Sequence, residues 1–325
     1  MENSILDVKK LSVYVTVGDR KFPAVRNVSF SVLKGEIFGI VGESGCGKTL
    51  TALSVPELLS DGIFQSESSV LFDGVPVHNL PAREKRSIYG KDISVIFQEP
   101  MTALNPLVSI HKQVEESLRL HTNMSKMQRH ERVKQCLLEV GIRNVEQVME
   151  MYPHELSGGM RQRVMIASAV ICRPKLLIAD EPTTALDMTT QNQVLGLMRK
   201  INASYGTAIL FISHDLKVVS SLCNRMAVMY AGSFVEQGSV RDVFTNPCHE
   251  YTKGLLNSIP SAEKKGTRLE CIQGKVPSVT ESKMACAFAP RCNKAEQQCY
   301  IQIPEKKVIS QDHCAWCHFS CKGEL

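Results

Sequence analysis

The chain has 325 residues, of which 43% are hydrophobic and 22% charged, a composition typical of a folded globular protein. Its 38 lysines and arginines nearly balance 33 aspartates and glutamates, so the formal net charge of +5 does not indicate nucleic-acid binding. No segment approaches the roughly 18 to 20 consecutive apolar residues that span a bilayer, and the amino terminus lacks a signal-peptide core. We therefore expect a cytoplasmic chain whose membrane role, if it has one, comes through partners.

The amino-terminal segment is expected to form two strands joined by a turn. Apolar and polar residues alternate in LSVYVTV (11–17) and in AVRNVSFSV (24–32), with a turn at Gly18–Asp19 between them. The short apolar run EIFGIV (36–41) follows and is typical of a buried strand. TLTALSVPELL, which begins at Thr49, has the spacing of a helix. The chain thus runs from a buried strand through a glycine-rich loop into a helix.

The glycine-rich loop, GESGCGKT (42–49), fits the pattern G-x-x-x-x-G-K-[ST] in the strand-loop-helix context that a phosphate-binding loop requires. Glycines let the backbone curl so that its N–H groups face the phosphates, and the following helix adds a partial positive charge. Lys48 is expected to reach the β- and γ-phosphates and the Thr49 hydroxyl to bind Mg²⁺. Cys46 lies inside this loop and is a candidate for oxidation.

From about residue 99 to 172 the sequence predicts mainly helices. Ser125 and Ser157 each precede a run with helical spacing and are expected to be amino-terminal caps. Pro174 is expected to end the second of these helices.

Four short apolar runs then predict further strands: LLIA (176–179), AILFIS (208–213), RMAVMY (225–230) and SFVEQG (233–238). A helical pattern separates the first two runs, and an Ala-Gly turn makes the last two a hairpin. Alternating strands and helices indicate an α/β fold with a mostly parallel sheet covered on both faces. After about Pro260, the sequence SAEKKGTRLE predicts a linker.

Polar residues follow two of the predicted strands. Asp180 ends one strand and could support a metal, and Glu181 beside it could orient and polarise an attacking water. His214 ends the next strand, where it could face a γ-phosphate, although a single histidine there is more often structural. Gln98 ends an apolar run in VIFQEP and means little by itself.

LSGGM (156–160) places a serine and two glycines at a helix start, which is a second anion-binding site far from the first. The phosphate loop, Gln98, LSGGM, LLIADEP, TTALD and SHDL together resemble an ABC (ATP-binding cassette) ATPase over residues 5 to 260. The resemblance implies a RecA-like mixed sheet core, an antiparallel amino-terminal β subdomain and a helical signature subdomain. We expect a cassette at 1–260 and a Cys-rich extension at 261–325.

The resemblance implies roles for the motif residues. The phosphates of ATP and its Mg²⁺ would be bound by Gly42, Ser44, Gly45, Cys46, Gly47, Lys48 and Thr49. Asp180 and Gln98 would join Thr49 at Mg²⁺, and Glu181 would position the water. His214 and Gln98 would sense the γ-phosphate.

In that family two cassettes dimerise head to tail, and each nucleotide lies between one phosphate loop and the other chain's signature motif. Ser157 and Gly159 would therefore contact the nucleotide on the partner subunit, and Asp187 would communicate across the dimer. An aromatic residue is expected to stack on adenine, and the candidate is Tyr14, with Val15 as the alternative at that position.

Longer strings narrow the resemblance to the oligopeptide/dipeptide/nickel permease ATPases. They are VIFQEPMTALNP, the run from Ser157 to Asp187, VMYAGSFVEQG and HEYTKGLLNSIP. Met160 stands where the general family has Gln, but SGGMRQRVMIA is typical of this branch. The resemblance implies a second, non-identical cassette ATPase, two transmembrane permeases and an extracytoplasmic binding protein, with this chain peripheral at the cytoplasmic face of the inner membrane. The cargo would be peptide, or alternatively nickel or another metal chelate.

A soluble ABC ATPase acting in translation or DNA repair is the alternative of another class. Translation-type members usually carry two cassettes on one chain, whereas this chain has one phosphate loop. Repair-type members insert long coiled coils, and no sustained heptad occurs here. A transport ATPase of the translocase class is therefore expected.

Seven of the twelve cysteines crowd into the carboxyl-terminal segment: Cys271, Cys286, Cys292, Cys299, Cys314, Cys317 and Cys321. In a reducing compartment such crowding indicates metal before disulfide. Cys286-x5-Cys292-x6-Cys299 with Cys317 resembles the extension of the same branch, which in some members holds a [4Fe–4S] cluster. Zinc, or no metal, is the alternative. Cys314, Cys321 and His318 are additional candidate ligands.

Overall fold

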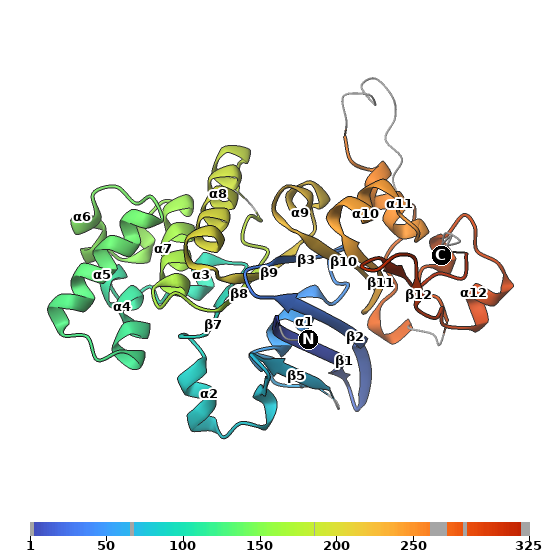
Figure 1. The fold of residues 1–325 in the computed structure, drawn as a ribbon, viewed down its shortest axis with the longest axis horizontal. Coiled ribbons are helices and arrows are strands. Elements are labelled where there is room, and N and C mark those ends of the chain that lie inside the picture. The colour runs from blue at the N-terminus through green and yellow to red at the C-terminus, as the bar shows by residue number, and fades with distance from the viewer. Residues whose placement is uncertain (1–2, 66–67, 185, 261–271, 282–284, 320–325) are drawn as a thin grey trace. The chain divides into compact units, whose positions relative to one another are not determined.

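The computed structural model describes residues 3–65, 68–184, 186–260, 272–281 and 285–319 (Figure 1). The predicted linker and two of the clustered cysteines, Cys271 and Cys321, lie outside the described residues. The chain forms two compact units. The helical unit comprises Met1–Leu6, Val32–Glu36 and Leu71–Leu210, and the phosphate-loop unit comprises Asp7–Ser31, Ile37–Val70 and Phe211–Leu325. The expected boundary between residues 260 and 261 stays a prediction.

The helical unit is built mainly from α-helices, coloured cyan to yellow in Figure 1. They are α2 (Ala82–Ile88), α3 (Pro100–Ala103), α4 (Ile110–His121), α5 (Lys126–Glu139), α6 (Val145–Glu150), α7 (Gly158–Val170) and α8 (Met188–Tyr205), with the 3-10 helices η1 (Val77–Asn79) and η2 (Pro153–Glu155). Helix α4 packs against α5, α6 and α7. Strands β7 (Ile93–Ile96) and β8 (Leu176–Asp180) pair in parallel, and β5 (Ser69–Phe72) pairs antiparallel with β6 (Val75–Pro76). Strand β9 (Ala208–Ser213) leads into the second unit.

The two predicted serine caps are confirmed. Ser125 precedes α5 and forms a capping box, in which its hydroxyl accepts from the Gln128 N–H at 3.3 Å and the Gln128 side chain accepts from the Ser125 N–H at 2.8 Å. Ser157 precedes α7 and accepts from the Met160 N–H at 3.4 Å. Both caps satisfy N–H groups that have no partner within their own helix.

The phosphate-loop unit contains most of the strands. They are β1 (Ser4–Val17), β2 (Arg20–Leu33), β3 (Ile37–Val41), β4 (Ile63–Gln65), β10 (Arg225–Tyr230), β11 (Ser233–Ser239), β12 (Lys307–Val308) and β13 (Cys314–Ala315). Its helices are α1 (Lys48–Ser54), α9 (Leu216–Leu222), α10 (Val240–Thr245), α11 (Glu250–Asn257) and α12 (Gln297–Ile301), with η4 (Val279–Glu281) and η5 (Ala289–Arg291). Strand β1 is antiparallel to β4 and neighbours β2. Strand β10 runs parallel to β3 and antiparallel to β11, so the sheet is mixed.

The predicted β10–β11 hairpin agrees with the structure, whereas the predicted end of helix α1 does not. The β10–β11 hairpin is found as expected, around Ala231 (φ +42°) and Gly232 (φ +86°). Helix α1 was expected to run through PELL but ends at Ser54. Pro56 lies two residues further on, and a proline has no backbone N–H with which to continue the hydrogen bonds of a helix.

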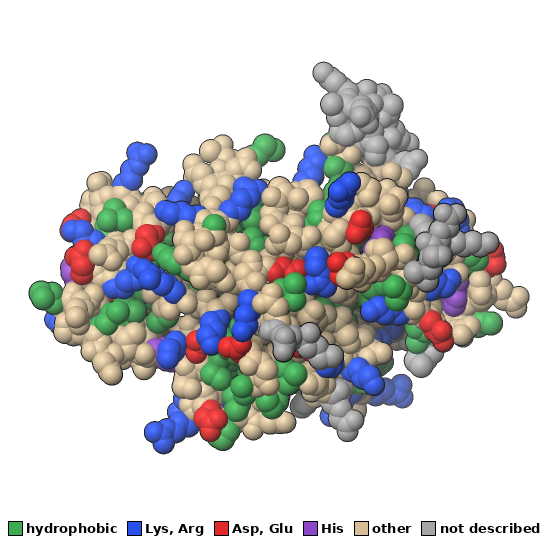
Figure 2. Space-filling view, in the orientation of Figure 1, with side chains coloured by type: hydrophobic (Ala, Val, Ile, Leu, Met, Phe, Trp, Pro, Cys, Tyr) green, Lys and Arg blue, Asp and Glu red, His purple; other side chains and the backbone are tan. Residues whose placement is uncertain are grey.

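The surface carries both signs of charge. On the face shown in Figure 2, Lys and Arg side chains are interspersed with Asp and Glu, as the near balance of charges leads one to expect. Among the described residues, no helix has both the length and the apolar character needed to cross a membrane.

Candidate functional site

The phosphate loop follows β3, and its shape depends on glycine at three positions. At Gly42, an added Cβ would lie 2.1 Å from the carbonyl oxygen of Met229. Gly45 and Gly47 have φ angles of +78° and +103°, a region that residues with a Cβ rarely adopt. The loop can therefore curl tightly against the end of β10 only with these glycines in place.

Lys48 folds back over the loop and is almost fully buried, with 4% exposed. Its Nζ donates to the carbonyl oxygens of Gly42 at 2.9 Å and Glu43 at 3.1 Å. Ser44 is exposed and Thr49 is half-buried. The loop thus holds the Lys48 ammonium group beside its own backbone and leaves Ser44 exposed at its edge.

Cys46 is not the oxidation-prone thiol that the sequence suggested. Its side chain is 1% exposed, and burial raises its pKa to about 11, although Lys48 opposes part of that shift. The reactive form of a cysteine is the thiolate, so a buried thiol with a raised pKa is inert near neutral pH.

Gln98 and Glu181 meet within the helical unit. Gln98 follows β7 and Glu181 follows β8, and the Gln98 Nε2 lies 3.3 Å from the Glu181 Oε2. The Thr184 hydroxyl donates to the same oxygen at 2.8 Å. Asp180, the last residue of β8, is 3% exposed. Two of the predicted catalytic residues are therefore in contact at the carboxyl ends of neighbouring parallel strands.

The signature helix α7 is tied to the segment after Glu181. Gln162 is 2% exposed, and its Nε2 donates to the Pro182 carbonyl oxygen at 2.7 Å. This contact holds the Ser157 end of the helix and the Glu181 segment in one arrangement. Sequence analysis missed both Gln162 and Thr184, since a polar residue in a helix or turn carries no sign of its distant partner.

Asp187 caps α8 next to the signature motif. Its carboxylate accepts from the N–H groups of Thr189 and Thr190 at 3.0 Å each and from the Thr190 hydroxyl at 2.7 Å, and the Thr190 bonds above all lower its pKa. A Cβ on Gly159 would lie 3.4 Å from the Thr190 methyl carbon. Gly159 and the start of α8 are therefore close together in the helical unit.

His214 and Tyr14 belong to the phosphate-loop unit. His214 is exposed at the end of β9, directly before Asp215, which caps α9. Tyr14 lies in β1 opposite Phe64 of β4. Tyr14 and Val15 are both half-buried, so the expected contact with adenine stays a prediction for either residue.

All four cysteines of the predicted cluster, Cys286, Cys292, Cys299 and Cys317, line one cavity in the phosphate-loop unit. His318 also lines it, whereas Cys314 lies in β13 and is not among the lining residues. Burial raises the pKa of Cys286 to about 11 and also raises the pKa of Cys292 and Cys317. Cysteines up to 31 positions apart in the sequence thus converge, as a shared metal or cluster requires.

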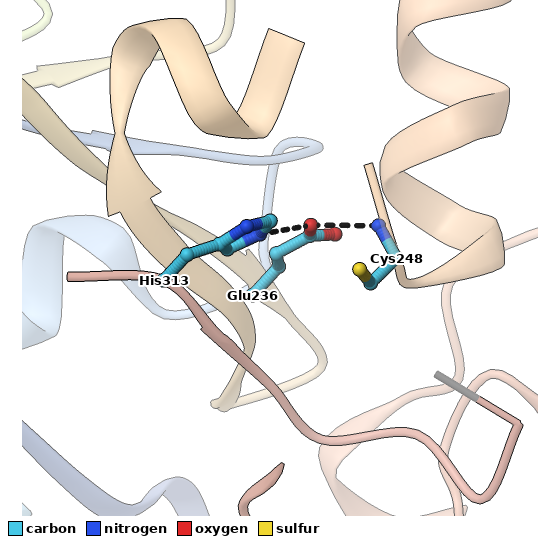
Figure 3. A group of neighbouring side chains, drawn as sticks. All are labelled: Glu236, Cys248 and His313. Atoms are coloured by element: carbon cyan, nitrogen blue, oxygen red, sulfur yellow. Dashed lines mark hydrogen bonds and ion pairs between the residues drawn. The ribbon is translucent and has the colours of Figure 1, made fainter. Parts of the chain in front are cut away.

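A separate group of buried side chains, Glu236, Cys248 and His313, has its candidate ligand atoms within 4.8 Å of one another (Figure 3). One Glu236 oxygen accepts from the Cys248 N–H at 2.8 Å and lies 2.8 Å from the His313 Nε2, and the other accepts from the His249 N–H at 2.9 Å. Because hydrogen bonds already occupy the carboxylate, we interpret this group as an anchor between β11 and the tail rather than as a metal centre.

Two family models match the sequence. Residues 25–184 match the model described as ABC transporter, and residues 235–299 match the oligopeptide/dipeptide transporter, C-terminal region. The oligopeptide transport ATP-binding protein AppD of Bacillus subtilis is 45% identical over 93% of this chain and 92% of its own. OppD of Escherichia coli is 45% identical over 93% and 89%, and the dipeptide transport protein DppD of Haemophilus influenzae is 43% identical over 93% and 92%.

Solved structures share the fold. A dimeric post-hydrolysis state of the ATP-binding cassette MJ0796, bound to ADP and Pi, superposes with a TM-score of 0.66 at 27% identity, covering 73% of this chain and 99% of that one. The cbiO1 protein of Clostridium perfringens, part of the cbiONQ ABC transporter complex, gives 0.63 at 27% identity, covering 75% and 91%. These similarities confirm the expected α/β cassette fold class.

Proposed function

Because the chain belongs to the ABC transporter family, in its oligopeptide/dipeptide transport branch, we propose that it binds and hydrolyses ATP to drive a peptide importer. The observation that carries this proposal is a complete set of reactive groups. The phosphate loop retains Lys48 and Thr49, and Glu181 keeps its carboxylate beside Gln98. A chain that only binds ATP would be expected to lack one of them.

Each reactive group has a chemical role. The ATP phosphates are bound by Gly42, Ser44, Gly45, Cys46, Gly47, Lys48 and Thr49, and Lys48 balances their charge. Thr49, Gln98 and Asp180 supply hydroxyl, amide and carboxylate oxygens, the ligands that Mg²⁺ prefers. When bound by these residues, Mg²⁺ would supply positive charge against the charge that develops on the phosphates. Glu181 orients the attacking water, and His214 donates a hydrogen bond to the γ-phosphate.

The nucleotide also needs a second cassette. Ser157 and Gly159 contact the nucleotide of the partner subunit, Asp187 communicates across the dimer, and Tyr14 stacks on adenine. The dimeric MJ0796 cassette, bound to ADP and Pi, supports the pairing of two such chains. In this protein the partner is a second, non-identical cassette. The pair lies at the cytoplasmic face of the membrane beneath two permeases, which receive cargo from an extracytoplasmic binding protein.

The cargo is peptide. The three relatives named above are oligopeptide or dipeptide transport proteins, so the comparisons do not favour the nickel alternative. They also argue against a soluble ABC ATPase that takes no part in transport.

The cysteine cavity holds a [4Fe–4S] cluster through Cys286, Cys292, Cys299 and Cys317. The convergence of the four cysteines on one cavity supports this assignment. The cluster has a structural role, since a loop-rich segment with few large apolar residues needs a cross-link to stabilise its fold. Anaerobic purification followed by iron, sulfide and zinc analysis tests the assignment: about four irons and four sulfides per chain are expected, and stoichiometric zinc would reject it.

The transport function is tested by affinity purification of the tagged chain from detergent-solubilised membranes, with mass spectrometry of its partners. Two polytopic permeases and a second cassette ATPase are expected. Recovery only from the soluble fraction, with ribosomal or DNA-repair proteins, would leave the ATPase chemistry intact and reject the transport role.

A further inference from the structure

The Cys-rich tail contacts the phosphate loop through Arg291, whose side chain is 7% exposed. Its Nη1 lies 2.8 Å from one carboxylate oxygen of Glu43, and its Nη2 lies 3.2 Å from the other. Nε and Nη2 also donate to the carbonyl oxygens of Gln273 at 2.8 Å and Ile272 at 3.3 Å, and Nη1 to the Tyr230 hydroxyl at 3.3 Å. Every nitrogen of the guanidinium has an acceptor, which holds the group in one orientation.

Glu43 is the second residue of the phosphate loop, and its backbone helps set the shape of the loop. Its N–H donates to the Tyr251 hydroxyl at 3.0 Å. Its carbonyl oxygen accepts from the Cys46 N–H at 3.3 Å and from the Lys48 Nζ at 3.1 Å. Arg291 therefore binds the side chain of Glu43, and the carbonyl oxygen of Glu43 positions Lys48.

Buried aromatic rings support this contact. Tyr230 ends β10, Tyr251 lies in α11 and Phe288 immediately precedes η5, and their ring centroids are 4.6 to 5.4 Å apart. The guanidinium carbon of Arg291 lies 5.7 Å from the centroid of the Tyr230 ring. The tail, α11 and the phosphate loop thus share one packed cluster, in which a displacement of Arg291 would also displace Glu43.

We propose that Arg291 is a positioning residue for ATP binding, acting on the phosphate loop through Glu43. This inference rests on the proposed function, because it requires that the loop bind ATP phosphates. Arg291 neutralises a carboxylate that would otherwise be an unpaired anion beside the phosphates. Its planar group also fixes both oxygens of Glu43, which the point charge of a lysine cannot do.

The test measures the Kd of Mg²⁺–ATP for the full chain by isothermal titration calorimetry. Arg291→Ala is expected to raise the Kd about tenfold, the scale of one uncompensated charge near the ligand. Arg291→Ala combined with Glu43→Gln removes both charges and is expected to return the Kd to within about threefold of the original. Lys294→Ala is the matched control, because it removes an exposed tail cation that pairs with Glu250 and leaves the Kd unchanged.

An unchanged Kd in Arg291→Ala, or a double variant that binds as weakly as the single one, would overturn the inference. If Arg291→Ala does not fold, Arg291→Lys decides the matter. A rise of about threefold is expected from losing the two-oxygen contact, and no rise would be contrary to the inference. Lys48→Ala tests the nucleotide site itself. Normal ATP binding by Lys48→Ala would reject the proposed function. Loss of ATP binding in Lys48→Ala, together with normal binding by the Arg291 variants, would reject the positioning role alone.

Discussion

At Glu181 the backbone has a φ of +44°, a left-handed conformation that residues with a side chain rarely adopt. Hydrogen bonds from Thr184 and Gln98 hold the carboxylate, and its side chain is close to fully buried. Strain of this kind persists where the surroundings determine the conformation, and it is concentrated at functional sites. The surrounding residues therefore orient this carboxylate, although the backbone conformation at Glu181 is strained.

Replacing Glu181 with Gln is expected to leave Mg²⁺–ATP binding intact and to lower turnover by roughly 10²-fold or more, the scale for losing one preorganised catalytic group. Gln keeps the shape and can still accept from Thr184, but it lacks the charge that polarises water. The measurement is steady-state ATPase activity of the assembled transporter, together with the Kd for ATP. Glu305→Gln, at an exposed tail position, is the control. Near-normal hydrolysis in Glu181→Gln would refute the assigned role.

Cys46 gives a prediction about reactivity. With its pKa near 11 in the folded chain, the thiolate fraction at pH 7.5 is lower by about 100-fold than for an ordinary thiol. Iodoacetamide is therefore expected to label Cys46 slowly in the native chain and rapidly in guanidinium chloride, as peptide mapping by mass spectrometry can measure. Equal labelling rates under the two conditions would contradict the buried position of this thiol.

At the scale of elements, the start of α7 combines a structural role with a proposed functional one. Ser157→Asp is expected to preserve the helix, because Asp caps as well as Ser, but to place a negative charge toward the partner's γ-phosphate. ATPase activity of the assembled transporter should fall by about 10²-fold while the unfolding midpoint stays unchanged. Ser125→Asp, at the capped start of α5, is the matched control and should alter neither quantity. Full activity in Ser157→Asp would show that the serine only caps the helix.

Elements with local signals could be predicted from the sequence. The β10–β11 hairpin follows from two apolar runs and a turn that contains Gly232, a residue type that tolerates the positive φ found there. The helix caps at Ser125 and Ser157 follow from a serine before a periodic run. The end of α1 was predicted too late, because the apolar spacing continues past Pro56 although a proline has no N–H to continue the helix.

The motifs also identified the phosphate loop, Glu181 and the four cavity cysteines, but not the side chains that hold them. Arg291 and Glu43 are 248 positions apart, and Gln162 reaches a carbonyl oxygen 20 positions away. Neither contact has a periodic pattern, and each depends on how complete elements pack. Sequence motifs therefore identify the proposed ATP-binding residues more readily than the side chains that position them.

For the molecule as a whole, the Cys-rich tail is an integral part of the phosphate-loop unit. The Arg291–Glu43 ion pair joins it to the phosphate loop, and the buried contact between His313 and Glu236 joins it to β11. Strand β13 also pairs with β11. A structural change in the tail can therefore alter the phosphate loop directly, through these contacts.

This connection predicts that the cysteine cavity influences nucleotide binding. Arg291 lies between two lining residues, Cys286 and Cys292, so a group bound by both cysteines would fix the turn that carries the guanidinium. Cys292→Ser is expected to lower iron content and to raise the Kd for Mg²⁺–ATP by up to about tenfold, the limit set by losing the Arg291 contact altogether. Cys172→Ser, at a half-buried cysteine of the helical unit, should change neither quantity. Loss of iron with an unchanged Kd would mean that η5 keeps its position through its own packing, and the group bound in the cysteine cavity would then have no influence on ATP binding.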